Sequence, residues 1–293
     1  MREHLQSEPV ECFHCGASVG LVFGIRLADS RSVAVKAHPP DVEEATLRSF
    51  SSAQRSLTAA GFPAPRPLGG PGRLLNTLAV AEAWLPGSPG DFDDPAVVAA
   101  SAAAFAHHTR LLRRVRFEAL PRTIAGEPWP PRPHNALFDF SLDVEGARWI
   151  DDVAIAARPH LERGEVVAAH GDWSGKHVRF VDATVAAVYD WDSLRLDREP
   201  VLAGFAAACH WVMLDPSRPW RAEPRRVRAF LDAYDASRGR PMSPPERDAA
   251  LAAAVYLFAY TARCEHGFIG AGVPVTAIRE TLVPAVNDLL SRG

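Results

Sequence analysis

The segment HGDWSGKHVRFVDATVAAVYDWD, residues 170–192, contains side chains that can bind metals or transfer protons. These polar residues lie between apolar runs of the sequence. EVVAAH leads into it, and VRFVDATVAAVYD contains a turn-forming VDAT. Short β-rich runs bounded by polar turn residues predict strands. The expected order is a strand, a polar loop and a hairpin. Such a hairpin would return Asp190 to the side of Asp172, although the two are far apart along the chain.

Residues before Pro95 and residues after it predict different kinds of secondary structure. Before it, apolar β-branched runs and one helical spacing predict a hairpin, a helix and a further strand, over residues 20–28 with 32–38, 41–60 and 74–87. Asp41 with Glu44 is a plausible N-cap arrangement for that helix. After Pro95, alanine-rich and amphipathic stretches predict helices, over residues 96–115, 146–164, 201–214, 225–237, 244–267 and 274–292.

Composition restricts the class of protein. The chain has 293 residues, 47% of them apolar, and a formal net charge of −3, which permits one large domain or two lobes and does not point to nucleic acid. The N-terminus has no signal-peptide core, and no apolar run reaches about 18 residues, so we expect a cytoplasmic protein without a membrane span. Cys12 and Cys15 look like half a zinc site, but the absence of a second close pair favours packed thiols.

Asp172 and Asp190, with a basic residue between them, suit phosphoryl transfer. One aspartate can orient the attacking hydroxyl and accept its proton, while the other binds the Mg²⁺ that bridges the nucleotide phosphates. Far upstream, Lys36 lies near the end of the second hairpin strand, after the Gly-containing turn GASVG, residues 16–20. A lysine placed there can reach the α- and β-phosphates.

These features, in this order, resemble the aminoglycoside phosphotransferase and choline kinase family of small-molecule kinases, over residues from about 10 to about 260. HGD-x4-H corresponds to the family's HGD-x4-N, and VYDWD to its I-D-[WFL] segment. VAVK resembles the lysine strand, GFPAPRPL the loop after the first helix, and AEAWLPG the hinge. The resemblance implies an α+β, two-lobed protein-kinase-like fold, with a nucleotide-binding N-lobe over residues 1–86 and a mainly helical, catalytic C-lobe over residues 87–293.

The resemblance also implies roles for individual residues. Asp172 would be the catalytic base or the group that orients the acceptor, and Asp190, rather than Asp192, the principal Mg²⁺ ligand. Lys36 would bind the phosphates of ATP, and His170 would be structural. Ser18 in the glycine turn would lie over the phosphates, and the backbone of Glu82, Ala83 and Trp84 would hold the adenine.

Two positions depart from the family pattern. His177 replaces an asparagine at the second metal position, and Mg²⁺ prefers oxygen to imidazole. A weakened metal site, a contact through water, Mn²⁺ in place of Mg²⁺ and an inactive enzyme all remain open. In the first helix the central candidate to pair with Lys36 is Gln54, where the family has glutamate, so no ion pair is expected there. Lys176 is expected to be a surface loop residue.

We therefore predict an ATP- and Mg²⁺-dependent kinase of a small-molecule hydroxyl group, with an aminoglycoside-like antibiotic or related natural product as the leading acceptor. The alternatives are a kinase of choline, homoserine or a sugar, a non-catalytic nucleotide-binding protein, and a metal-dependent hydrolase. Neither a nucleic acid nor a membrane is an expected partner. Residues that could line an acceptor site are either acidic or aromatic: Asp139, Asp192, Asp197, Glu199, Glu265, Phe138, Phe140, Trp173, Trp191 and Trp211.

Overall fold

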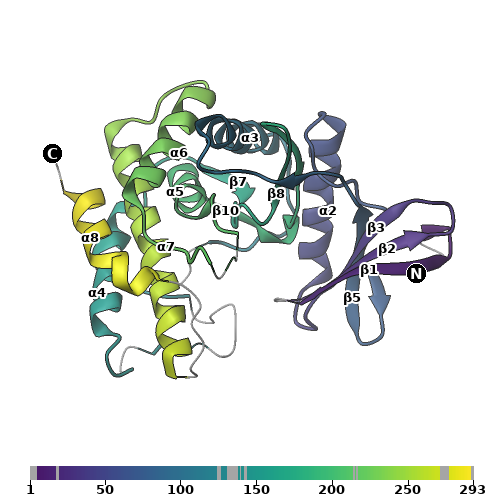
Figure 1. The fold of residues 1–293 in the computed structure, drawn as a ribbon, viewed down its shortest axis with the longest axis horizontal. Helices are drawn as coiled ribbons and strands as arrows, with labels where there is room; N and C mark the ends of the chain where they lie inside the picture. The colour runs from purple at the N-terminus through teal and green to yellow at the C-terminus, as the bar shows by residue number, and fades with distance from the viewer. Residues whose placement is uncertain are drawn as a thin grey trace.

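The computed structural model describes residues 5–17, 20–123, 127–130, 138, 140–141, 144–213, 215, 217–270 and 277–291. A β-sheet with one helix forms the N-terminal part, and a larger, mainly helical part follows it (Figure 1). The predicted α+β, two-lobed fold is confirmed. The division between residues 86 and 87 stays a prediction. Among the described residues, no helix is both long and apolar enough to cross a membrane.

The N-terminal sheet is antiparallel, with strand order β1-β2-β3-β5-β4. Its strands are β1 (Pro9–Ala17), β2 (Leu21–Leu27), β3 (Ser32–Ala37), β4 (Gly72–Leu74) and β5 (Thr77–Ala83). The β2–β3 hairpin is the one predicted. Cys12 and Cys15 are exposed thiols on β1, so the expectation of packed thiols is wrong for this pair, whereas Cys209 and Cys264 are buried.

Helix α2 (Glu44–Ala59) buries Leu47, Phe50 and Leu57, as its apolar spacing predicts. The predicted N-cap is wrong, because the helix starts later than expected. Val42 donates its backbone N–H to Pro39 in a turn, and Glu43 takes the N-cap position without a side-chain hydrogen bond. Asp41 therefore lies outside the helix.

The C-terminal part is built around buried helices. The helices are α3 (Pro95–Leu112), α4 (Arg148–Ala157), α5 (Glu199–Cys209), α6 (Pro224–Ser237), α7 (Pro244–Gly270) and α8 (Ile278–Leu290). A short turn of 3₁₀ helix, η1 (Arg158–His160), follows α4. Each predicted helix is present, but α5 is buried along its whole length rather than amphipathic, because α6, α7 and β7 surround it.

Short strands lie within the segment 170–192 and on either side of it. Strand β7 (Val166–His170) pairs with β10 (Leu194–Arg198), and β8 (Val178–Val181) forms a hairpin with β9 (Thr184–Val188). Strand β6 (Ser88–Pro89), just after the hinge, pairs with β8. The predicted strand–loop–hairpin order is confirmed, while β10 was not predicted.

Candidate active site

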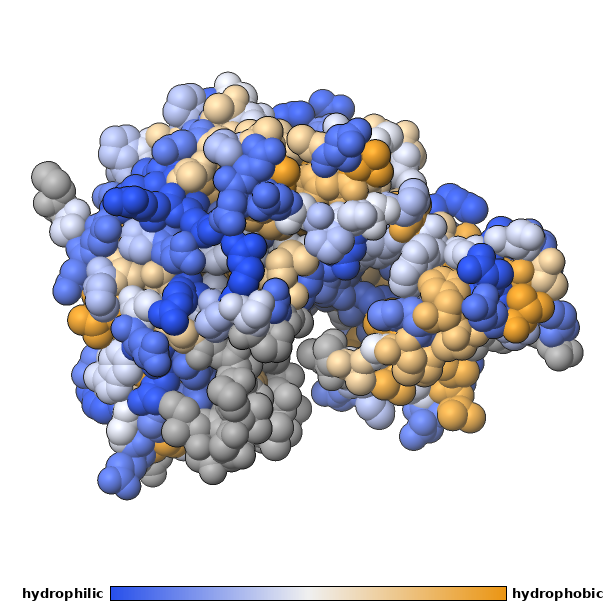
Figure 2. All heavy atoms as spheres, in the orientation of Figure 1, coloured by the Kyte–Doolittle hydropathy of each residue, from blue (hydrophilic) through white to orange (hydrophobic). Residues whose placement is uncertain are grey.

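A cavity of about 440 Å³ lies between the two parts, where the surface is hollowed (Figure 2). The N-terminal sheet, the hinge (residues 81–87) and the segment 176–190 all contribute to its wall. Its lining residues are His14, Gly16, Ala17, Val22, Ala34, Lys36, Glu82, Trp84, Leu85, Gly87, Lys176, His177, Arg179, Tyr189 and Asp190. A larger cavity of about 510 Å³ opens beside Arg158, but it is lined by none of the predicted site residues.

His170 joins the loop to the strand that precedes Asp190. Its Nε2 lies 2.8 Å from the carbonyl oxygen of Tyr189, and its Nδ1 accepts the backbone N–H of Asp172 at 3.2 Å. One neutral tautomer, protonated on Nε2, satisfies both contacts. Burial lowers the pKa of His170 to about 4, which keeps the ring neutral at pH 7. The geometry agrees with the structural role that the resemblance implies.

Lys176 and His177 both contact the carboxylate of Asp172. Its Oδ2 lies 2.8 Å from Lys176 Nζ and 3.2 Å from His177 Nε2. Burial raises the pKa of Asp172, but His177 and Lys176 outweigh burial and leave the pKa below its usual range. A carboxylate that stays ionised in this way can orient an acceptor hydroxyl by accepting its hydrogen bond, although it is a weak base.

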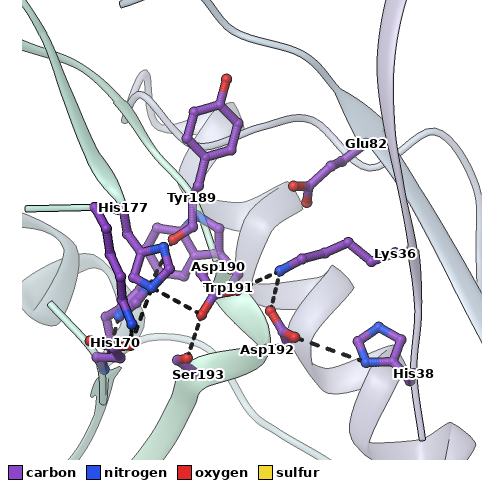
Figure 3. Close-up of polar contacts among 12 residues, drawn as sticks. Lys36, His38, Glu82, His170, His177, Tyr189, Asp190, Trp191, Asp192 and Ser193 are labelled. Atoms are coloured by element: carbon purple, nitrogen blue, oxygen red, sulfur yellow. Dashed lines mark hydrogen bonds and ion pairs between the residues drawn. The ribbon is translucent and has the colours of Figure 1, made fainter. Parts of the chain in front are cut away.

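Asp172, His177 and Asp190 each offer one ligand atom, and these three atoms lie within 4.8 Å of one another. His177 Nε2 is 3.4 Å from Asp190 Oδ2 (Figure 3). Asp190 has a left-handed backbone, with φ of 68°, and Ser193 donates its hydroxyl to Asp190 Oδ2 at 2.8 Å. Two carboxylate oxygens and one imidazole nitrogen form a ligand set suited to a divalent cation.

Lys36 reaches across the cavity from β3 to two carboxylates. Its Nζ lies 2.7 Å from Asp190 Oδ1 and also contacts Asp192 Oδ1 (Figure 3). Burial lowers the pKa of Lys36, but Asp192 and Asp190 outweigh burial and raise it above its usual value. Strand β9 ends at Val188, so it is not strand alternation that brings Asp190 and Asp192 together. The left-handed turn at Asp190 and the 3₁₀ turn η2 (Trp191–Ser193) direct both towards Lys36.

Gln54, the candidate partner of Lys36 on the helix, hydrogen-bonds to other groups. Gln54 Nε2 donates instead to Glu82 Oε2 at 2.5 Å and to the Pro65 carbonyl at 3.3 Å. Burial raises the pKa of Glu82 to about 7, although the charge of nearby Lys36 opposes this shift. The acidic neighbour of Lys36 on this side therefore comes from β5 rather than from the helix.

Sequence reasoning missed several residues of the cavity wall. Lys176 is not a surface loop residue, because it lines the cavity and pairs with Asp172. Its i,i+4 spacing from Asp172, and the fact that the chain has only two lysines, were signals for it. Leu85, Arg179 and Tyr189 also line the cavity.

Some predicted residues lie elsewhere. Ser18 and Asp139 fall outside the described residues. Ala83 is not among the cavity-lining residues, and its backbone N–H donates to Arg66. Trp173, Trp191 and Glu199 belong to the interior rather than to an acceptor site. Both indoles are 1% exposed, and Glu199 is bound by Arg238 and Tyr234.

The chain has a fold that is also found in small-molecule kinases and phosphotransferases of known structure. No protein-family model and no curated protein matches the sequence. Among solved structures, the chain is similar to an amicoumacin kinase in complex with AMP-PNP, Ca²⁺ and Ami, with a TM-score of 0.71 and 9% identity over 97% of this chain and 87% of that one.

Two further structures have the same fold. An aminoglycoside phosphotransferase from Alicyclobacillus acidocaldarius has a TM-score of 0.56 and 14% identity, over 97% of this chain and 93% of that one. A choline/ethanolamine kinase family protein from Mesorhizobium loti has a TM-score of 0.57 and 15% identity, over 99% and 94%. At these identities the likeness shows a shared fold. It confirms, at the level of the fold, the resemblance predicted from the motifs.

Proposed function

We propose that the protein is an ATP-dependent phosphotransferase that uses a divalent cation and phosphorylates a hydroxyl group of a small molecule. One observation carries the proposal: Lys36, His177 and Asp190 line a single cavity between the sheet and the helical part, and Asp172 offers a ligand atom within 4.8 Å of those of His177 and Asp190. The similar amicoumacin kinase structure contains AMP-PNP and Ca²⁺, which supports a nucleotide and a divalent cation at this place. Such an enzyme would act in the cytoplasm, where its nucleotide is.

Each residue of the site would have its own role in phosphoryl transfer. Asp190 and His177 would hold the cation, Mg²⁺ with Mn²⁺ as the alternative, and it would neutralise charge on the nucleotide phosphates. Lys36 would leave its carboxylates to bind the same phosphates. Asp172 would orient the acceptor hydroxyl in line with the γ-phosphoryl group, and Lys176, 2.8 Å from Asp172, would offset negative charge there.

We propose a hydroxylated natural product, such as an antibiotic, as the acceptor. The TM-score of 0.71 with an amicoumacin kinase and the aminoglycoside phosphotransferase fold support this choice. A small-metabolite kinase is the second candidate, and the similarity to the choline/ethanolamine kinase family protein favours it. In either case residues 1–86 would bind the nucleotide and residues 87–293 would supply the catalytic loop and the acceptor site.

The substitution Asp172→Asn tests the proposal. It removes the charge but keeps the size of the side chain and an oxygen that can still face a cation, and Asp190 and His177 are unchanged, so stabilisation by ATP with Mg²⁺ or Mn²⁺ in a thermal-shift assay should remain. ADP release with a panel of hydroxylated antibiotics and metabolites should fall by about 10²- to 10⁴-fold.

Asp182→Asn is the matched control, since Asp182 is exposed in the β8–β9 turn and the same chemical change there should leave the rate unchanged. An unchanged rate in Asp172→Asn would refute the role of Asp172. A wild-type protein that ATP stabilises with neither cation would refute the nucleotide site itself.

A further inference from the structure

The hydroxyl of Tyr189 binds the hinge backbone at Leu85. The backbone N–H of Leu85 donates to the Tyr189 hydroxyl at 2.8 Å, and that hydroxyl donates to the Leu85 carbonyl oxygen at 2.5 Å. Both residues line the cavity beside Trp84, whose ring centroid is 6.1 Å from that of Tyr189. Figure 3 shows the phenol ring projecting away from the ion pairs of Lys36. One side-chain oxygen therefore satisfies both polar groups of the Leu85 backbone.

The two hinge residues before Leu85 donate their backbone N–H groups to other backbone. Ala83 donates to the Arg66 carbonyl at 2.9 Å, and Trp84 donates to the Ser32 carbonyl at 3.0 Å. Of residues 83–85, only Leu85 has an N–H whose partner is a side chain, which can turn away without breaking the fold. Among these three residues, Leu85 is thus the one whose N–H a ligand can take over.

A nucleobase needs the kind of edge that Leu85 presents. Purines carry hydrogen-bond donors and acceptors side by side, and an N–H next to a C=O matches such an edge. The Tyr189 hydroxyl is itself both donor and acceptor, and burial raises its pKa, so the phenol stays protonated at neutral pH. The phenol therefore makes the same pair of contacts that a base would make.

We propose that Tyr189 gates the base-binding end of the cavity, because its hydroxyl occupies the Leu85 backbone until a nucleotide base displaces it. The inference rests on the proposed nucleotide site and adds a regulatory residue to it. Base binding exchanges two existing hydrogen bonds for two new ones, so those contacts contribute little net affinity in the wild-type protein. Without the hydroxyl, the same contacts would be gained outright.

The test compares a nucleotide with a ligand that has no base. Calorimetric titration with Mg²⁺ and AMP-PNP should give a dissociation constant about 3- to 10-fold lower for Tyr189→Phe than for wild type, the range expected for one net hydrogen bond. Inorganic triphosphate should bind both proteins equally, since it can reach the groups of the site that bind phosphate but not the hinge. Tyr189→Ile, which removes the ring as well, should also favour AMP-PNP over triphosphate.

Tyr256→Phe is the matched control, because it removes a hydroxyl bonded to the Pro128 carbonyl, outside the cavity wall, and should change neither constant. Equal or weaker AMP-PNP binding in both Tyr189 variants, with the wild type still binding AMP-PNP, would overturn the gate and leave the proposed function standing. A wild-type protein that binds neither ligand would overturn both.

Discussion

His177 lies between two carboxylates with a single ring nitrogen facing them. Its Nε2 is 3.2 Å from Asp172 Oδ2 and 3.4 Å from Asp190 Oδ2. The backbone around it is fixed, since its N–H donates to Ser174 and its carbonyl accepts from Tyr189. To bind a cation, the ring must direct the unprotonated Nε2 towards it. An imidazole at this position favours softer divalent cations over Mg²⁺.

The substitution His177→Asn should therefore shift cation preference towards Mg²⁺. We expect the ratio of the Mg²⁺ to Mn²⁺ dissociation constants, measured by titration of the AMP-PNP complex, to fall roughly tenfold, or about 1.4 kcal/mol. This readout needs no acceptor. His160→Asn serves as the control, since His160 is exposed at the end of η1. An unchanged ratio in His177→Asn would exclude His177 as a ligand.

At the level of single elements, local patterns predicted most of the structure. The spacing of Leu47, Phe50 and Leu57 identified the buried face of α2, because one helical face repeats every three to four residues. Strand β1 was missed because its residues are nearly all exposed and give no apolar alternation. Strand β10 does alternate Leu194 and Leu196 with charged residues, which is a strand pattern, so it could have been found.

His210, at the C-terminal end of α5, is buried as a neutral ring. Its Nδ1 lies 3.1 Å from the Ala207 carbonyl, and its ring centroid lies 4.7 Å from that of Phe230. Burial lowers the pKa of His210 to about 3, against about 6.5 in an unfolded chain. Between these values the unfolded chain binds the proton and the folded protein does not. The contribution of His210 to stability is thus complete above pH 6.5 and is lost as the pH falls towards 3.

His210→Gln should make unfolding less sensitive to acid. Glutamine does not titrate, so the slope of the unfolding free energy against pH, between about pH 5.5 and 4, should decrease by about 1.4 kcal/mol per pH unit. Urea unfolding at several pH values measures this slope. His160→Gln, at an exposed site, should keep the wild-type slope. A wild-type slope in His210→Gln would contradict a buried neutral ring at this position.

At the level of the whole molecule, the site depends on contacts that no local pattern encodes. The motif spacings pointed to Lys36, Asp172 and Asp190, since each belongs to an ordered set of short motifs. The contact of Lys36 with Asp192 joins residues 156 apart, and that of Leu85 with Tyr189 joins residues 104 apart. Such contacts depend on how the N-terminal sheet is placed against the C-terminal part, and the sequence around each residue carries no signal of it.

Lys36 connects the two parts of the molecule and must change partners if it is to bind phosphate. It comes from the N-terminal sheet, and both of its carboxylate partners, Asp190 and Asp192, come from the C-terminal part. Its side chain is 10% exposed and that of Asp192 is 31% exposed, so the pair is shielded from solvent more than a surface ion pair. If the proposed nucleotide site is right, Asp192 would stabilise the nucleotide-free arrangement and compete with phosphate for the same ammonium group.

Asp192→Asn should then move two measurements in opposite directions. The unfolding temperature of the nucleotide-free protein should fall by about 2 to 4 °C, the change expected for the loss of one such contact in a protein of this size. AMP-PNP with Mg²⁺ should bind about 3- to 10-fold more tightly, because Lys36 then has only Asp190 to leave. Thermal unfolding and calorimetric titration measure the two effects. Asp29→Asn, which breaks an exposed pair with Arg31, should change neither. A lower unfolding temperature with equal or weaker nucleotide binding would mean that Asp192 supports the site instead of competing with its ligand.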